Sequence, residues 1–136
     1  MALVAKIQFG NNDIGRYNKE YLVSDVRCHF TRSHNNKQPD SSARCESISF
    51  TVVAPDKKDP LLYQWYINMS CMTGRILFIN PEASNDNEYY KSIYFEEARC
   101  LSFREQYDIH KNQRRRLTVS FEAESIEVND IEFLHL

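Results

Sequence analysis

Alternation of apolar and polar residues is the main pattern along this chain of 136 residues. Because successive side chains of a strand point to opposite faces, this alternation predicts half-buried β-strands. The segments with this pattern are 3–9, 21–30, 45–54, 90–103 and 117–128, and segment 75–79 is apolar on both faces. In segment 21–30, the residues expected on the buried face are Leu22, Val26, Cys28 and Phe30.

Two of these predicted strands break their own alternation. In segment 90–103, Glu97 and Arg99 fall in the phase of the apolar residues Phe95, Leu101 and Phe103, so we expect a bulge or an exposed stretch there. In segment 117–128 the apolar phase shifts at residue 125, which predicts a second bulge near this serine.

A helical pattern occurs once, between Asp59 and Gly74. Asp59 suits an N-cap because its carboxylate can accept a hydrogen bond from a first-turn N–H, and Pro60 suits the first helical position. Gly74 can end the helix in a left-handed conformation. The apolar positions with helical spacing are Leu61, Leu62, Trp65, Tyr66 and Met69, of which Leu62, Trp65 and Met69 are expected to form the helix core.

These elements predict a mostly β fold, a single domain spanning residues 1–136. We expect a small β-barrel or sandwich of about seven to nine strands, with one flanking α-helix in the Asp59–Gly74 region. Eight Tyr, eight Phe and one Trp supply enough large apolar surface for one core.

Composition excludes several classes of function. The formal net charge of −2 provides no basic field for nucleic acid. No apolar run approaches the ~20 residues of a membrane-spanning helix, so we expect no direct membrane insertion. The first residues have no basic region, long apolar stretch or small-residue cleavage site, so we expect no secretory signal peptide.

Candidate catalytic and metal-binding residues do not form a recognisable site. The four cysteines, Cys28, Cys45, Cys71 and Cys100, are scattered and are interpreted as reduced, largely buried thiols. The four histidines are isolated, so we expect neither a metal nor a cofactor. The carboxylate pairs Glu96–Glu97 and Glu122/Glu124 are typical of a wet sheet face, so we expect no enzyme activity.

Two long polar loops and one charged run remain. Residues 31–44 and 80–88 are too long and too polar for simple hairpin turns. The run Arg114, Arg115 and Arg116 could bind phosphate, but its shortness favours a solvated turn or a patch of salt bridges facing a partner.

The order of several short motifs resembles a known family. These are Gln38-Pro-Asp-Ser-Ser42 in a polar loop, Ile48-Ser-Phe-Thr-Val52, Leu61-Leu62 with Trp65, Gly74-Arg-Ile-Leu-Phe78, Ile93-Tyr-Phe-Glu-Glu-Ala-Arg-Cys100 and Leu117-Thr-Val-Ser-Phe-Glu-Ala-Glu124. In this order the chain resembles, over nearly its whole length, a divergent branch of the haemolysin-coregulated protein family, the tube proteins of type VI secretion systems.

The resemblance implies a structural subunit that joins others in hexameric rings, which stack into the inner tube of a contractile injection apparatus. The implied partners are copies of itself, the sheath, spike and baseplate proteins, and effector proteins in the lumen. The implied location is cytoplasmic, followed by secretion through the apparatus without a signal peptide. The alternative, suggested by the many tyrosines, is a monomeric β-sandwich that binds a sugar or a peptide.

The resemblance also gives the loops and charged residues expected roles. The loop 31–44 would contact the next ring, with Gln38, Pro39, Asp40 and Ser41 near its tip as the ring-stacking residues. Arg114, Arg115 and Arg116 would form a subunit-interface patch if they pair with an acidic neighbour.

Overall fold

The computed structural model describes residues 4–31, 34–35, 38–39, 44–53, 59–79, 89–108, 114–129 and 131–134. Its elements are β1 (Val4–Asn11), β2 (Arg16–Thr31), β3 (His34–Asn35), β4 (Gln38–Pro39), β5 (Arg44–Val53), α1 (Leu61–Asn68), β6 (Met72–Ile79), β7 (Tyr89–Asp108), β8 (Arg114–Val128) and β9 (Ile131–Leu134). The expectation of a mostly β fold with one flanking helix is confirmed for this part of the chain.

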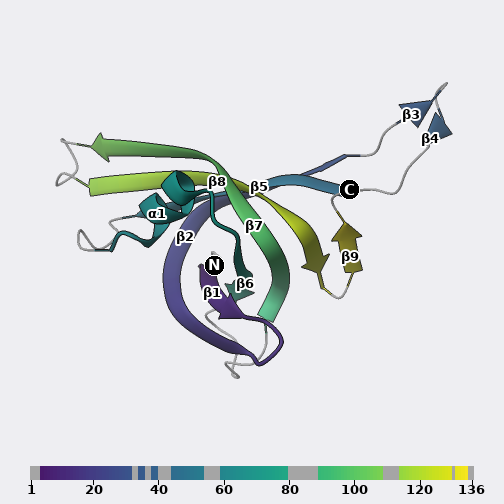
Figure 1. The fold of residues 1–136 in the computed structure, drawn as a ribbon, viewed down its shortest axis with the longest axis horizontal. Coiled ribbons are helices and arrows are strands. Elements are labelled where there is room, and N and C mark those ends of the chain that lie inside the picture. The colour runs from purple at the N-terminus through teal and green to yellow at the C-terminus, as the bar shows by residue number, and fades with distance from the viewer. Residues whose placement is uncertain are drawn as a thin grey trace.

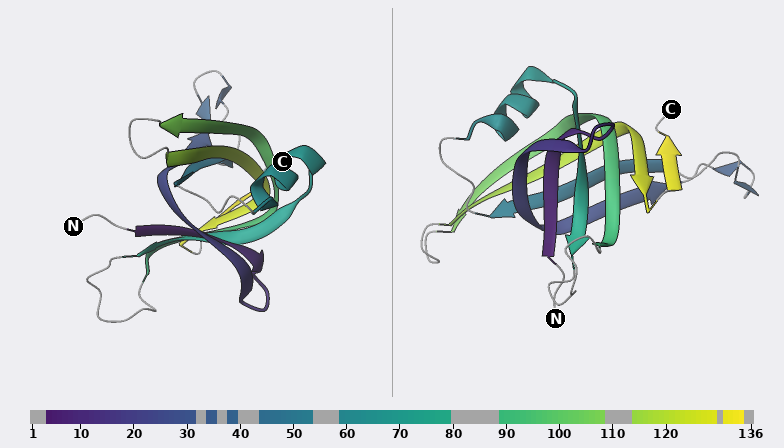
Figure 2. Two further views of the ribbon diagram at one scale, coloured as in Figure 1. Left: turned by 90° about the vertical axis from the view of Figure 1, so that its left-hand side faces the viewer. Right: turned by 90° about the horizontal axis from the view of Figure 1, so that it is seen from below.

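Six antiparallel strands close into a barrel. Their order is β5-β2-β1-β6-β7-β8, and β8 pairs again with β5, so the sheet returns to its first strand. β9 adds to β8 beyond the point where β5 ends its pairing. Figures 1 and 2 show that β7 and β8 also extend together beyond the barrel, next to α1.

The alternation predicted for the barrel strands is confirmed where a strand contains no bulge. Ile7 and Phe9 in β1, and Ile48 and Phe50 in β5, are at most 2% exposed. β8 likewise buries Leu117, Val119, Phe121 and Ala123. Strand β6 is buried on both faces at Ile76 and Leu77, as its apolar sequence predicts.

The prediction of the buried face of β2 is correct for Val26 and Cys28 but wrong for Leu22 and Phe30. Asp25 has a left-handed φ of 51°, and the register with β5 shifts between Ser24 and Arg27. Such a bulge reverses the side-chain phase of the strand. Before it, Tyr21 is buried while Leu22 is 62% exposed; after it, Val26 and Cys28 pack against the core and Phe30 is again exposed.

The bulge predicted in β7 is confirmed, whereas the one predicted near Ser125 in β8 is wrong. Glu97 has a φ of 54°, and the β6–β7 register shifts beside it. The β7–β8 register runs through Ser125 without a shift. The two strands therefore exchange their buried and exposed faces at the same point. A separate register shift leaves Leu101 unpaired with β8 and 49% exposed, contrary to its predicted phase.

The helix is shorter than predicted. It spans Leu61–Asn68, and Met69 rather than Gly74 adopts the left-handed conformation at its end, with φ 53° and ψ 30°. Gly74 lies within β6, where a Cβ would overlap the carbonyl oxygen of Gln8 on β1. The glycine is therefore required by close strand packing, not by a helix cap.

Candidate functional site

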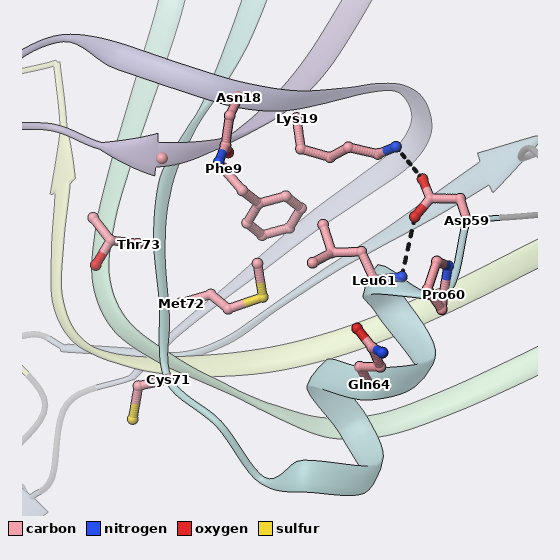
Figure 3. A pocket seen from close by; sticks show the side chains of 11 residues that line it. Phe9, Asn18, Lys19, Asp59, Pro60, Leu61, Gln64, Cys71, Met72 and Thr73 are labelled. Atoms are coloured by element: carbon pink, nitrogen blue, oxygen red, sulfur yellow. Dashed lines mark hydrogen bonds and ion pairs between the residues drawn. The ribbon is translucent and has the colours of Figure 1, made fainter.

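The Asp59 carboxylate connects the start of α1 to β2. Asp59 Oδ1 accepts a 3.0 Å hydrogen bond from the Leu61 N–H, and Asp59 Oδ2 accepts a 2.6 Å bond from the Tyr21 hydroxyl. Lys19 forms an ion pair with the same carboxylate (Figure 3). Asp59 therefore supplies the first-turn acceptor that the sequence predicts, although Pro60 occupies the N-cap position.

This partly buried network shifts the pKa values of both acidic members, Asp59 and Tyr21. Burial by itself raises the pKa of Asp59, but the hydrogen bonds from Lys19, Tyr21 and Leu61 outweigh it, and the pKa lies below its usual range. Burial, followed by the hydrogen bond to Asp59, raises the pKa of Tyr21 well above its usual range. The carboxylate therefore stays ionised and the phenol stays neutral at physiological pH.

A recess of about 520 Å³ lies beside this network (Figure 3). Its lining comprises Phe9, Gly10, Asn18, Lys19, Asp59, Pro60, Leu61, Gln64, Cys71, Met72 and Thr73. Asp59 is fully engaged by its three donors, and the Cys71 thiol lies 3.4 Å from Arg99 Nε rather than next to a base. Besides the Lys19–Asp59 ion pair, the described lining thus presents amide, hydroxyl and thiol groups without a nucleophile–base pair.

The cysteines are free where the structure describes them. Cys28 and Cys100 are half-buried, and burial raises the pKa of both thiols, that of Cys100 to about 11. Cys71 is exposed, contrary to the expectation of buried thiols, and the side chain of Cys45 lies outside the described part. Within the described residues, no three His, Cys, Asp or Glu side chains are placed to hold a metal ion.

The three residues predicted as the helix core separate into two environments. Leu62 and Trp65 are 2% and 1% exposed, and Trp65 Nε1 donates a 3.0 Å hydrogen bond to the Ala98 carbonyl oxygen. Met69 is 79% exposed and lies past the end of the helix, so its predicted place in the core is wrong. The early helix end explains this, because the left-handed turn at Met69 takes its side chain off the helix face.

The predicted stacking loop contains a small two-stranded ribbon. In it, His34 of β3 pairs with Pro39 of β4, and Asn35 pairs with Gln38. Figure 1 shows this ribbon at the opposite end of the molecule from α1, well away from the barrel. We call β3 and β4 the arm; the predicted stacking residues Asp40 and Ser41 lie outside the described residues.

The arginine run does not form one surface. Arg115 has the same phase as the buried Leu117, and its side chain is only 15% exposed. Arg116 points to the other face and is exposed, as the alternation of a strand requires. Arg114 begins β8, and its side chain is not described.

A cluster that the sequence analysis missed surrounds Arg115. We call it the Arg115 cluster: Tyr63 from α1, Phe103, Glu105 and Tyr107 from β7, and Arg115 from β8. The rings of Tyr63 and Phe103 lie 4.8 Å apart, and the Tyr107 hydroxyl donates a 2.7 Å hydrogen bond to Glu105. One sequence feature could have indicated this cluster: Arg115 has the same alternation phase as the buried residues of β8.

Exposed apolar side chains gather at the same end of the molecule. Nine large apolar residues of the described part are exposed, and five of these belong to α1, the residue after it, or the second half of β7. These five are Tyr66, Ile67, Met69, Leu101 and Tyr107. Exposed apolar side chains on neighbouring elements make this end of the molecule a candidate contact surface.

Comparison with known proteins identifies the family. A family model described as "Hemolysin coregulated protein Hcp (TssD)" matches residues 1–135. The chain belongs to the Hcp (TssD) family. This is a family of structural tube proteins of type VI secretion systems rather than of enzymes, and the resemblance proposed from sequence motifs is confirmed.

Solved structures of two Hcp proteins and of a type VI secretion system effector share the fold. Hcp1 from Flavobacterium johnsoniae is 19% identical, with a TM-score of 0.76 over 97% of this chain and 99% of that chain. The secreted protein Hcp3 from Pseudomonas aeruginosa is 14% identical, with a TM-score of 0.64 over 93% and 90%. A type VI secretion system effector from Yersinia pestis is 14% identical, with a TM-score of 0.60 over 93% and 87%.

A direct sequence comparison with curated proteins gives no match. In the described part of the chain, no helix has the length and apolar character needed to span a membrane.

Proposed function

We propose that this chain is a tube subunit that assembles into hexameric rings, and that these rings stack into the inner tube of a type VI secretion apparatus. Membership of the Hcp (TssD) family over residues 1–135 carries this proposal. The closed barrel supports it as well, because a barrel pairs most of its strand edges internally and leaves its outer surfaces for contacts between subunits. The chain reaches the tube from the cytoplasm and leaves the cell through the apparatus. Its further partners are the sheath, spike and baseplate proteins, and effectors in the lumen.

The arm is the proposed contact between rings. It lies at one end of the molecule, and α1 lies at the other (Figures 1 and 2). In a head-to-tail stack, the arm of one copy therefore faces the α1 end of the next. Pro39 has a fixed φ, which reduces the conformational entropy that the arm loses on docking.

Arg116 is the member of the arginine run that suits a contact within the ring. Its side chain is exposed on β8, whereas Arg115 is held inside the subunit. Charge reversal by Arg116→Glu should weaken ring formation slightly, since exposed pairs are worth less than about 1 kcal/mol. Sedimentation velocity over a range of protein concentrations measures the change.

Replacement of the arm tests the stacking role. A variant with residues 33–42 exchanged for a short Gly-Ser linker should fold and form rings but no long tubes. Negative-stain electron microscopy distinguishes these states directly. Tubes of normal length would contradict a stacking role for the arm, and loss of rings would instead assign it to ring closure. A wild-type protein that stays monomeric at high concentration would favour a monomeric binding module.

A further inference from the structure

Strand β7 bends at the left-handed residue Glu97 (Figure 1). Before the bend, Phe95 pairs with Gly74 of β6. After the bend, Ala98 pairs with Met72, so β7 has two residues where β6 has one. We call the four residues from Phe95 to Ala98 the β7 corner. Beyond it, β7 pairs with β8 alone among the described strands.

A side chain from the β1–β2 turn binds the backbone at one end of the β7 corner. Asn12 Nδ2 donates hydrogen bonds of 3.0 Å and 3.2 Å to the carbonyl oxygens of Gly74 and Phe95, the pair that precedes the bulge. Asn12 Oδ1 accepts a 2.7 Å hydrogen bond from the Tyr17 hydroxyl. Both polar atoms of the amide are therefore engaged, and its orientation is fixed.

A side chain from α1 binds the backbone at the other end of the β7 corner. Trp65 Nε1 donates a 3.0 Å hydrogen bond to the carbonyl oxygen of Ala98, the first residue that pairs again after the bulge. The two donors thus lie on either side of Glu96 and Glu97, whose side chains are exposed. A buried carbonyl oxygen that loses its donor is costly, so each contact resists opening of the corner.

One buried aromatic ring connects the two contacts. The ring of Phe9 lies 5.4 Å from the ring of Trp65 and 6.0 Å from the ring of Phe95. Phe9 also belongs to β1, the strand that leads into the turn carrying Asn12. Because the two donors share this packed neighbour, a change at one should influence the other.

We infer that Asn12 and Trp65 form a two-sided brace that fixes the bend of β7. The β1–β2 turn and α1 thereby set the course of residues 99–108, which have one backbone edge without a strand partner in the described part of the chain. A bulge that slipped by one residue would exchange the buried and exposed faces of the strand. The brace prevents this slip and keeps Phe95 and Ala98, both 0% exposed, inside the barrel. It acts within the single subunit, whether or not subunits form rings.

Removal of the Asn12 donor tests the first side of the brace. Asn12→Asp keeps the size of the side chain and the acceptor for Tyr17 but loses the amide donor. Backbone amides of the β7 corner and of residues 99–108 should then exchange their hydrogens about tenfold faster, as followed by mass spectrometry on the full chain. Tyr17→Phe frees the Asn12 amide to rotate and should give a smaller increase at the same amides; it replaces Asn12→Asp if that variant does not fold.

Two references make this measurement specific. Asn18→Ala, which removes an exposed amide from β2 beside the same recess, should exchange like the wild type. The left-handed bulge at Asp25 of β2 is a second bend in the same molecule and should keep its exchange rate in every variant. Equal acceleration along the whole chain, or none at the β7 corner, would overturn the inference.

Removal of the Trp65 donor tests the second side and the coupling between the two. Trp65→Phe keeps an aromatic ring in the core and removes only the indole N–H, so the same amides should exchange faster. The double variant with Asn12→Asp should accelerate exchange by less than the product of the two single effects, because loss of either side already releases the corner. A full product would show that the two side chains act separately and would contradict a joint brace.

Discussion

The two faces of α1 differ in how fully their side chains are packed and hydrogen-bonded. On the barrel side, the ring of Trp65 packs 5.4 Å from Phe9 and 5.5 Å from Phe121, and its only polar atom has a hydrogen-bond acceptor. On the other side, Tyr66 is 46% exposed above Phe103, and the Arg115 guanidinium nearby has unpaired donors.

This difference separates the face of α1 that stabilises the single subunit from the face that is exposed. A core side chain with every polar atom satisfied contributes fully to the stability of the single subunit. An exposed aromatic such as Tyr66 contributes less to the stability of the single subunit, and shielded donors without partners cost free energy. Substitutions on the two faces should therefore change different measurements.

The largest expected effect is on the barrel side. Trp65→Ala should lower the free energy of unfolding by about 3–5 kcal/mol, the range for large aromatic deletions in a core. Tyr66→Ala, the next residue on the open face, should cost about 1 kcal/mol or less in the monomer. Denaturant midpoints of the two variants measure the contrast, and equal losses would show that the two faces do not differ as described.

Gly74 tests how tightly the barrel strands approach one another. Gly74→Ala should destabilise the fold by roughly 1–3 kcal/mol, because the new methyl group overlaps the Gln8 carbonyl oxygen and the Phe95 ring. Gly15→Asn is the matched control, since Gly15 lies in an exposed turn with nothing near its Cβ position and asparagine tolerates its φ of 66°. Thermal unfolding of both variants should separate them; similar losses would contradict a special role for Gly74.

The Asp59 network gives a smaller effect with a defined pH dependence. Asp59→Asn should cost about 2 kcal/mol near neutral pH, because Lys19 and Tyr21 lose a charged partner. The folded pKa of Asp59 is lowered, so its stabilisation is present above the unfolded pKa of about 3.9 and is lost as the pH falls through the folded value. The difference between wild type and variant should shrink below about pH 4. A constant difference across that range would mean that ionisation of Asp59 is not involved.

The smallest expected effect concerns the end of α1. Met69→Gly should stabilise the monomer by about 1 kcal/mol, because a side chain at φ 53° is strained and glycine is not. Met69→Ala, which keeps the strain, should change stability by less than about 0.5 kcal/mol. A loss of several kcal/mol in either variant would mean that Met69 does belong to the helix core.

Much of the barrel could be predicted from the sequence, and the failures have specific causes. The buried positions of β1, β5 and the first part of β8 follow from alternation, because these strands run without a bulge. Leu22 was misplaced because a left-handed residue three positions later reverses the phase of β2. Gly74 was misassigned because glycine ends helices and also relieves close backbone contact, and the residue type alone does not distinguish the two.

The candidate sites were less accessible to sequence reasoning. The loop 31–44 stands out in the sequence by its length and polarity, but the β3–β4 pairing within it has no sequence signal. The run of three arginines suggests one patch, but strand alternation places Arg115 and Arg116 on opposite faces. The Arg115 cluster was missed because Tyr63, Glu105 and Arg115 come from three elements that meet only in the folded chain.

The sequence by itself determined the strand periods, the single helix and the family, because each depends on local spacing or on the order of motifs. Only the tertiary structure decided that β5 returns to β8 to close the barrel, since pairing between distant strands has no local signal. It also decided that β7 and β8 extend beyond the barrel under α1 (Figure 1). There two nitrogens of Arg115 are shielded from water without hydrogen-bond partners, because burial and hydrogen bonding depend on which surfaces the fold brings together.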